Sequence, residues 1–241
     1  MSTRRTPRVT WNMLRGGPLF AWVACACLAF AAQAQVAPSA AEAARYTGLH
    51  AAAYQGDLAR TRALLASAVD LNMRDPAGRT ALHIATFAQQ REIIRALAQA
   101  GANLQLLEDG YYDAVTIAAV ADDEETLRQL LALGASAKLT TSRYAGTALI
   151  AAAHLGHAGV VKQLIAAGAP VDHVNNLRWT AVIEAIVLGD GGTRHQDVLR
   201  ALLGAGASTR ITDREGNTPL TLAKARGHVA MVVLLEKAGA R

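Results

Sequence analysis

Histidine is the residue type in this chain best suited to metal binding or acid–base catalysis, and the chain has seven. No segment matches the His-Glu-x-x-His zinc motif, the P-loop, the Gly-x-Ser-x-Gly motif or a paired-cysteine metal site. A metal-dependent enzyme would require His154, His195 and Asp190 to converge from different helices or a loop. We therefore expect no enzyme, no cofactor and no metal site, and retain catalysis as a remote alternative.

The acidic run Asp122-Asp123-Glu124-Glu125 is a second place where chemistry could occur, because hard cations prefer clustered carboxylates. The run directly precedes Thr126, from which the apolar spacing indicates a helix. Acidic residues at a helix start interact favourably with the helix dipole. We therefore interpret the run as a helix start, with a cation site as the alternative.

The elements that would position any site follow a repeat of about 33 residues. Similar short segments begin at six positions, which we call the Thr row: Thr47, Thr80, Asp113, Thr147, Thr180 and Thr218. The intervals between them are 33, 33, 34, 33 and 38 residues. A second row consists of Leu64, Leu97, Leu130, Leu164, Leu202 and Leu235. A third row consists of Gly101, Gly134, Gly168, Gly206 and Gly239. Three rows in register indicate a repeat architecture.

Each unit is expected to contain two short amphipathic helices, such as Ala81 to Phe87 and Arg91 to Ala100. Such helices are shorter than the roughly 12 to 15 residues at which isolated helices become marginally stable, so stacking must supply the core. The interval of 38 places a five-residue insertion in repeat five, at the polar turn from Gly189 to His195. One extra residue lengthens the connection between Gly134 and Thr147, which leads into repeat four.

The pattern resembles the ankyrin repeat, whose unit opens with Asp-x-x-Gly-x-Thr-Pro-Leu-His-x-Ala and closes with Leu-Leu-x-x-Gly-Ala. Segments 75–85 and 213–220 match the opening closely, and Gly156-His157 and Gly227-His228 match the Gly-His that this family often has between its helices. The resemblance implies an all-α solenoid of about six stacked helix-turn-helix repeats with hairpin-like loops. It also implies that His50 and His83 tie adjacent loops together.

The resemblance covers residues 43–241, and we predict repeats at about 43–74, 75–107, 108–141, 142–174, 175–212 and 213–241 after a short linker, 35–42. Residues 1–34 are expected to be a signal peptide. Their arginines precede an uncharged run from Leu19 to Ala32, which is too short to span a bilayer, and the first acidic residue is Glu42. Cleavage is predicted after Ala34, with translation from Met1 or Met13, and an uncleaved inner-membrane anchor is the alternative.

Loss of residues 1–34 removes four of the 24 Lys and Arg residues and none of the 19 Asp and Glu residues, so the basic character of the chain belongs to the signal. We therefore exclude nucleic acid as a partner. The only cysteines, Cys25 and Cys27, are lost as well, so the mature chain has no disulfide. Export of such a domain is typical of the periplasm of a Gram-negative bacterium.

If the resemblance holds, the inner helices and hairpin tips form one concave face, which this family generally uses to bind proteins. Seven residues after each Thr-row position, the face presents Tyr54, Phe87, Val120, His154, Val187 and Ala225. Five of these are aromatic, imidazole or β-branched, a pattern typical of an interaction surface. The alternative, above all for the two valines, is that they pack between adjacent helices.

The hairpin tips indicate the same face. Repeats three to five have Tyr111, Ala145 and Arg178 where the family has a turn glycine, a replacement that costs turn stability. Tyrosine, tryptophan and arginine are also typical interface residues. We predict that the protein-binding residues are Tyr54, Arg79, Phe87, Tyr111, Tyr112, Val120, Tyr144, His154, Arg178, Trp179 and Val187.

The expected function is that of a monomeric, non-catalytic periplasmic scaffold or accessory factor that binds a folded protein. One such role would be to stabilise or regulate an enzyme, for example an oxidative-stress enzyme. The resemblance also allows an immunity-type inhibitor that neutralises a toxin.

Overall fold

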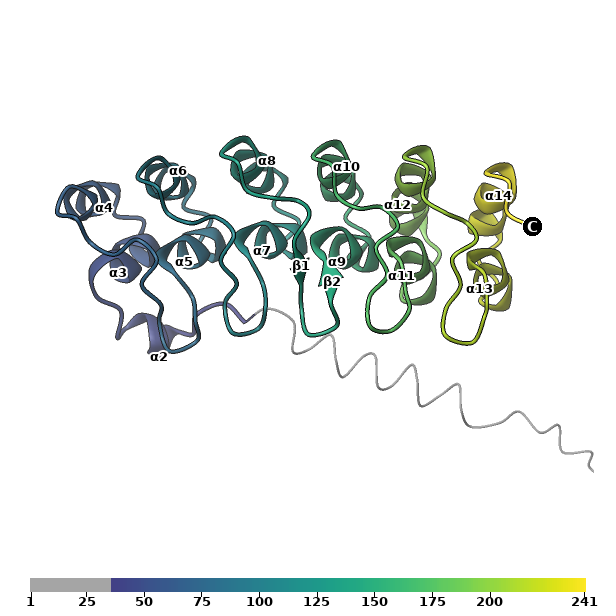
Figure 1. The fold of residues 1–241 in the computed structure, drawn as a ribbon, viewed down its shortest axis with the longest axis horizontal. Helices are drawn as coiled ribbons and strands as arrows, with labels where there is room; N and C mark the ends of the chain where they lie inside the picture. The colour runs from purple at the N-terminus through teal and green to yellow at the C-terminus, as the bar shows by residue number, and fades with distance from the viewer. Residues whose placement is uncertain (1–35) are drawn as a thin grey trace, which may run out of the picture. The chain divides into compact units, whose positions relative to one another are not determined.

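The computed structural model describes residues 36–241, so the predicted signal segment lies outside the described residues. Paired helices stack side by side in two rows, which confirms the predicted solenoid (Figure 1). The row of first helices contains α3 (Gly48–Gln55), α5 (Ala81–Phe87), α7 (Ala114–Val120), α9 (Ala148–Leu155), α11 (Ala181–Val187) and α13 (Pro219–Ala225). The row of second helices contains α4 (Leu58–Leu65), α6 (Arg91–Gln99), α8 (Glu124–Ala132), α10 (Ala158–Ala166), α12 (Thr193–Gly204) and α14 (Val229–Lys237). None of the described helices has the length and apolar character needed to cross a bilayer.

The core lies between the two rows, where the predicted leucine row meets the alanines of the first helices. Leu97, Leu130, Leu164, Leu202 and Leu235 have 0% of their surface exposed. Leu64 is only partly buried, because α4 packs against the helix of one neighbouring repeat, α6. Complete burial of a leucine side chain contributes about 1.5 to 3 kcal/mol, so this row accounts for much of the packing between repeats.

The residues of the Thr row occupy the N-cap position of the first helices. The side chains of Asp113, Thr147 and Thr180 each accept a hydrogen bond from the backbone N–H three residues later, which satisfies a donor that the helix leaves free. The acidic run is a helix start, as predicted. Asp123 caps α8 by accepting from the Thr126 N–H at 3.0 Å, and Arg91 pairs with its carboxylate at 3.1 Å.

Hairpin tips connect the repeats, and they span residues 75–79, 108–112, 142–146, 175–179 and 213–217. In each tip the side chain of the first residue accepts hydrogen bonds from the backbone N–H groups of the third and fifth residues. These acceptors are Asp75, Glu108, Ser142, Asn175 and Asp213. Each turn is therefore closed by the side chain of its own first residue, in the manner of an Asx or Ser turn, with Glu108 taking this role in repeat three.

Backbone hydrogen bonds also join neighbouring tips to one another. They run from Asp109 N to Ala77 O (3.1 Å), from Ser142 N to Tyr111 O (3.0 Å) and from Asn176 N to Tyr144 O (2.8 Å). The tips of repeats two to five are thus held in a row by main-chain contacts, independently of most side chains.

The two irregular connections take different forms. The longer connection into repeat four closes as an antiparallel pair of two-residue strands, β1 (Thr140–Thr141) and β2 (Gly146–Thr147). The insertion in repeat five forms a polar turn only as far as Gly192, which is the N-cap of α12. Its last three residues are helical and lengthen α12 to 12 residues, because a backbone that can continue the helix satisfies its own hydrogen bonds.

The segment expected as a short linker, 35–42, contains the start of a helix, α2 (Ala40–Ala43). Ser39 and Glu42 form a reciprocal capping box at its N-terminus. Glu42 also pairs with Arg79 at 2.5 Å, so this short helix is attached to the tip of repeat two.

Candidate protein-binding surface

Four of the seven described non-glycine residues with a positive φ lie in the tips of repeats three to five, and the other three, Ala68, Gln89 and Asp122, lie in other turns. The fourth residue of every tip has a positive φ, and in repeats two and six it is glycine, Gly78 at 73° and Gly216 at 83°. The corresponding residues in between are Tyr111 at 69°, Ala145 at 53° and Arg178 at 66°. A side chain in this left-handed conformation costs on the order of 1 kcal/mol, and such costs tend to be retained at functional sites.

The strained tips carry large exposed side chains. Tyr111 has 53% of its surface exposed and Tyr144 has 36%, while Arg178 is also exposed. Tyr112 and Trp179, which precede the Thr row, are half-buried. The structure therefore brings five of the predicted residues together on adjacent tips, which we call the tip surface (Tyr111, Tyr112, Tyr144, Arg178 and Trp179).

Arg79 does not belong to this surface, because it is 3% exposed. Its guanidinium donates from Nε to Asp75 at 2.8 Å and pairs with Glu42, and Tyr46 donates to the same Asp75 carboxylate. Hydrogen bonds from Ser39 and Arg79 lower the pKa of Glu42 to about 2. Arg79 is a structural residue that joins α2 to repeat two, so the prediction that it binds a partner protein is wrong.

The tips differ in whether the side chain of the fifth residue donates a hydrogen bond to the first residue of the same turn. Arg79 folds back onto the first residue of its turn, and Asn217 does the same by donating to Asp213 at 3.0 Å. Tyr112 and Trp179 carry no donor that reaches back in this way. Their rings consequently stay at the rim of the tip, partly in contact with solvent.

The residues predicted to lie on the concave face seven positions after the Thr row are only partly exposed. Tyr54 is 38% exposed, although its ring packs edge-on against Tyr46 with centroids 6.2 Å apart. Phe87, Val120 and His154 are half-buried. Val187, on α11 between α9 and α13, is only 8% exposed, so the alternative of packing between helices holds for this residue.

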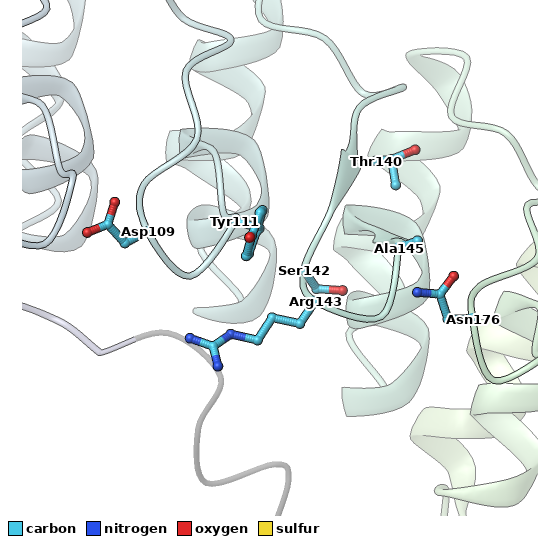
Figure 2. Close-up of a pocket in the computed structure, with 7 residues that line it drawn as sticks. All are labelled: Asp109, Tyr111, Thr140, Ser142, Arg143, Ala145 and Asn176. Carbon is cyan, nitrogen blue, oxygen red and sulfur yellow. The ribbon is translucent and has the colours of Figure 1, made fainter.

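A hollow of about 630 Å³ opens between the tips of repeats three to five (Figure 2). The residues that line it are Asp109, Tyr111, Thr140, Ser142, Arg143, Ala145 and Asn176. Figure 2 shows the Arg143 side chain extending from its own tip toward the side on which Tyr111 and Asp109 lie. Three of the lining residues, Tyr111, Ser142 and Ala145, have positive φ angles. Strained backbone positions therefore lie in the wall of this hollow.

The arginines near the hollow differ in their partners. Arg74 donates to the backbone oxygens of Gly78 and Leu107, and Arg214 donates to that of Asn176. Within residues 36–241, by contrast, the exposed side chains of Arg143 and Arg178 form no hydrogen bond or ion pair. These two cations remain available to a ligand.

The histidines serve mainly to connect segments of the stack. A ring nitrogen lies within hydrogen-bonding distance of a backbone carbonyl oxygen of another segment in His50, His83, His157, His173 and His195. The implied role of His50 and His83 is thereby confirmed. Burial lowers the pKa of His83 to about 4, so this imidazole is neutral at neutral pH.

The residues of the remote catalytic alternative do not converge as ligands. His195 uses one ring nitrogen on the Asp190 carboxylate at 3.0 Å and the other on the His154 carbonyl oxygen at 2.9 Å. The side chain of His154 faces Glu184 instead, with 3.8 Å between Nδ1 and Oε2. In the described part of the chain, no three His, Cys, Asp or Glu side chains are grouped as metal ligands would be.

Sequence reasoning missed several residues of the hollow, among them Arg143, Asn176 and Thr140. Arg143 stands directly before Tyr144 in the printed sequence, and aligning the tips by their turn acceptors would have placed it on the same face. Asn176 and Thr140 gave no comparable signal, because their proximity depends on how adjacent tips are joined.

Two of the solved structures with a similar fold come from bacteria. An ankyrin repeat domain from Acinetobacter baumannii AYE has a TM-score of 0.76 and 40% identity, over 80% of this chain and 98% of that chain. A chain in the structure of a predatory endopeptidase from Bdellovibrio bacteriovorus in complex with an immunity protein has a TM-score of 0.66 and 25% identity, over 80% and 98%.

Among curated proteins, the ankyrin repeat protein YahD of Escherichia coli (strain K12) is 45% identical over 86 residues, which are 35% of this chain. The match covers 43% of YahD, so this chain spans less than half the length of that relative. The family described as ankyrin repeats (3 copies) matches residues 24–107 and 115–213, and ankyrin repeats (many copies) match residues 193–236. Such repeats act as protein-interaction scaffolds and are typically non-catalytic. This chain belongs to the ankyrin-repeat family.

Proposed function

We propose that this protein is an exported scaffold that binds one folded partner protein through the tip surface of repeats three to five. The observation that supports the proposal is the run of three consecutive tips with non-glycine residues at positive φ, two of which expose Tyr111 and Arg178. A turn that only needed to close would be more stable with glycine, as in repeats two and six. Tyrosine and arginine at these positions are typical of residues that contribute most to protein interfaces.

The location of the protein is part of the proposal. The uncharged run after an arginine-containing N-terminus, together with the absence of cysteine beyond Cys27, supports export to the periplasm. Fractionation of cells that express the full-length gene, followed by mass spectrometry of the N-terminal peptide, tests it. We expect a periplasmic protein that begins at Gln35, and a cytoplasmic protein that retains its first residues would refute this part of the proposal.

Two roles are compatible with such a scaffold. The first is an accessory factor that stabilises or regulates an enzyme of the same compartment. The second is an immunity-type inhibitor, which is supported by the similarity to a chain from the complex of an endopeptidase with an immunity protein. The identity of the captured partner decides between them, since only the second role predicts a secreted hydrolase or toxin whose activity falls on binding.

The binding surface is tested by cross-linked capture from cells that express the tagged full-length gene. The tip variant combines Tyr111→Gly with Arg178→Gly, which removes both side chains and relieves both strained backbones. The control is Arg128→Gln on α8, an exposed arginine in the row of second helices. We expect the wild type and the control to capture the same partner, and the tip variant to lose it.

The choice of glycine makes the outcome decisive. Because the tip variant should be at least as stable as the wild type, loss of capture cannot be attributed to unfolding. Equal recovery of the same partner by wild type and tip variant would show that the tip surface is not the binding site.

A further inference from the structure

We infer that the hollow between the tips of repeats three to five recognises a carboxylate carried by the partner protein, on an Asp or Glu side chain. This inference rests on the proposed function, because it names the chemistry that the tip surface would bind. It commits to one occupant, an acidic segment of a protein.

Charge is the first argument. Arg143 is the only cation among the residues that line the hollow, and within the described chain its guanidinium has no hydrogen-bonding or ionic partner. Arg178, on the next tip, is exposed and unpaired in the same sense. A guanidinium donates two parallel hydrogen bonds to a carboxylate, a geometry that suits this group better than a neutral acceptor.

Preorganisation is the second argument. The wall of the hollow is held by the bonds from Ser142 N to Tyr111 O and from Asn176 N to Tyr144 O, so the tips that contribute the lining are already fixed relative to one another. The lining also offers hydroxyl and amide donors on Tyr111, Thr140 and Asn176. Binding to a fixed arrangement of donors loses less entropy than binding to mobile loops.

The acidic residue at the margin of the hollow restricts the ligand further. Asp109 lies close against the tip of repeat two, where a Cβ added to Gly78 would meet its carboxylate oxygen at 2.3 Å. Asp109 and Arg143 do not form an ion pair with each other. The Asp109 charge opposes any anion, and it opposes a dianion such as phosphate more strongly than a single carboxylate.

The test is an NMR titration of the purified protein, expressed from the full-length gene and labelled with ¹⁵N. The probes are the capped peptide Gly-Tyr-Asp-Tyr-Gly, its neutral counterpart Gly-Tyr-Asn-Tyr-Gly, and inorganic phosphate. We expect saturable shifts of the Ser142 and Asn176 amide signals with the acidic peptide. Binding of the neutral peptide, and binding of the acidic peptide to Arg143→Gln, should each be weaker by about tenfold. The variant Arg128→Gln should respond like the wild type.

Three results would overturn the inference: no saturable shift with the acidic peptide, equal affinity for the neutral peptide, or unchanged affinity in Arg143→Gln. Stronger shifts with phosphate than with the peptide would also contradict it. A failed titration would not refute the proposed function, because that function is tested by cross-linked capture, which depends on Tyr111 and Arg178 and uses no peptide. If capture is lost in the tip variant while the titration fails, the tip surface binds the partner by other chemistry.

Discussion

Asn175 donates a hydrogen bond from Nδ2 to Oε1 of Glu184 across 3.0 Å, which connects the tip of repeat five to the buried face of α11. The other side of the same amide accepts from the Leu177 and Trp179 N–H groups and so closes the turn. Oε2 of Glu184 has no hydrogen-bonding partner, and His154 Nδ1 lies 3.8 Å away, beyond hydrogen-bonding distance. A buried carboxyl group is thus in direct contact with the turn that presents Arg178.

This buried carboxyl should make stability depend on pH. Burial raises the pKa of Glu184 from 4.5 to about 7, so the folded state holds this proton more tightly than the unfolded chain. The free energy of unfolding should therefore fall as pH rises from 4.5 to 7. Glu184→Gln should flatten that fall and raise stability above pH 7 by on the order of 2 kcal/mol.

Urea unfolding at a series of pH values, followed by Trp179 fluorescence, measures the effect. His154 contributes the opposite slope, because burial lowers its pKa and stability is lost as its imidazole is forced to charge at acid pH. Comparing wild type with Glu184→Gln at each pH reports the Glu184 carboxyl together with its effect on the neighbouring His154. Parallel curves for the two proteins would show that Glu184 titrates normally.

Removal of the Arg79 guanidinium should destabilise the protein without affecting partner binding. Arg79→Ala leaves the buried Asp75 carboxylate without its cation and detaches Glu42, a change expected to cost about 3 kcal/mol. Arg178→Ala, at an exposed and unpaired arginine, should change stability by less than about 0.5 kcal/mol. Chemical denaturation of both variants provides the comparison, and similar losses would mean that the triad of Glu42, Arg79 and Asp75 contributes little.

Glycine at the strained tip positions should increase stability. Tyr111→Gly and Arg178→Gly each relieve a positive φ and are expected to raise the free energy of unfolding by about 0.5 to 1 kcal/mol, after the greater freedom of glycine in the unfolded chain is counted. The reverse change, Gly216→Ala, tests the same effect in open space, since an added Cβ there meets no atom within 4 Å. It should lose a similar amount, and a gain in stability for Gly216→Ala would contradict the interpretation of strain.

Truncation of the leucine row should have position-dependent effects. Leu130→Ala empties a site between two neighbouring repeats, where the side chain is 0% exposed, and should cost about 2 to 5 kcal/mol. Leu64→Ala should cost less, because Leu64 is partly exposed and packs against repeats on one side. Thermal and urea unfolding would reveal the difference, and equal costs at both positions would argue against a core built by stacking.

The fold could be predicted from the sequence because its determinants are local and periodic. Helix starts at the Thr row, buried leucines and the capping role of Asp123 each depend on residues a few positions apart. The predicted surface could be placed only in part. Tyr111 and Arg178 were found from the turn position they share, whereas the burial of Arg79 depends on Glu42, 37 residues earlier and on a helix outside the repeat pattern.

Val187 and the hollow show a second limit. Repeat register assigns Val187 and Tyr54 to equivalent positions, but their exposed fractions are 8% and 38%, because helices pack on both sides of α11. The hollow depends on side chains from tips about 33 residues apart and on which backbone groups bond between them. A periodic pattern specifies neither the exposure of equivalent residues nor the lining of the hollow.

The main-chain bonds between tips separate the geometry of the surface from its chemistry. Asp109, Ser142 and Asn176 donate from backbone nitrogen, a group that every residue except proline possesses. Outward-facing side chains can therefore be exchanged while the spacing of the loops is retained. The backbone of these tips could thus be kept while their side chains are redesigned to bind other proteins.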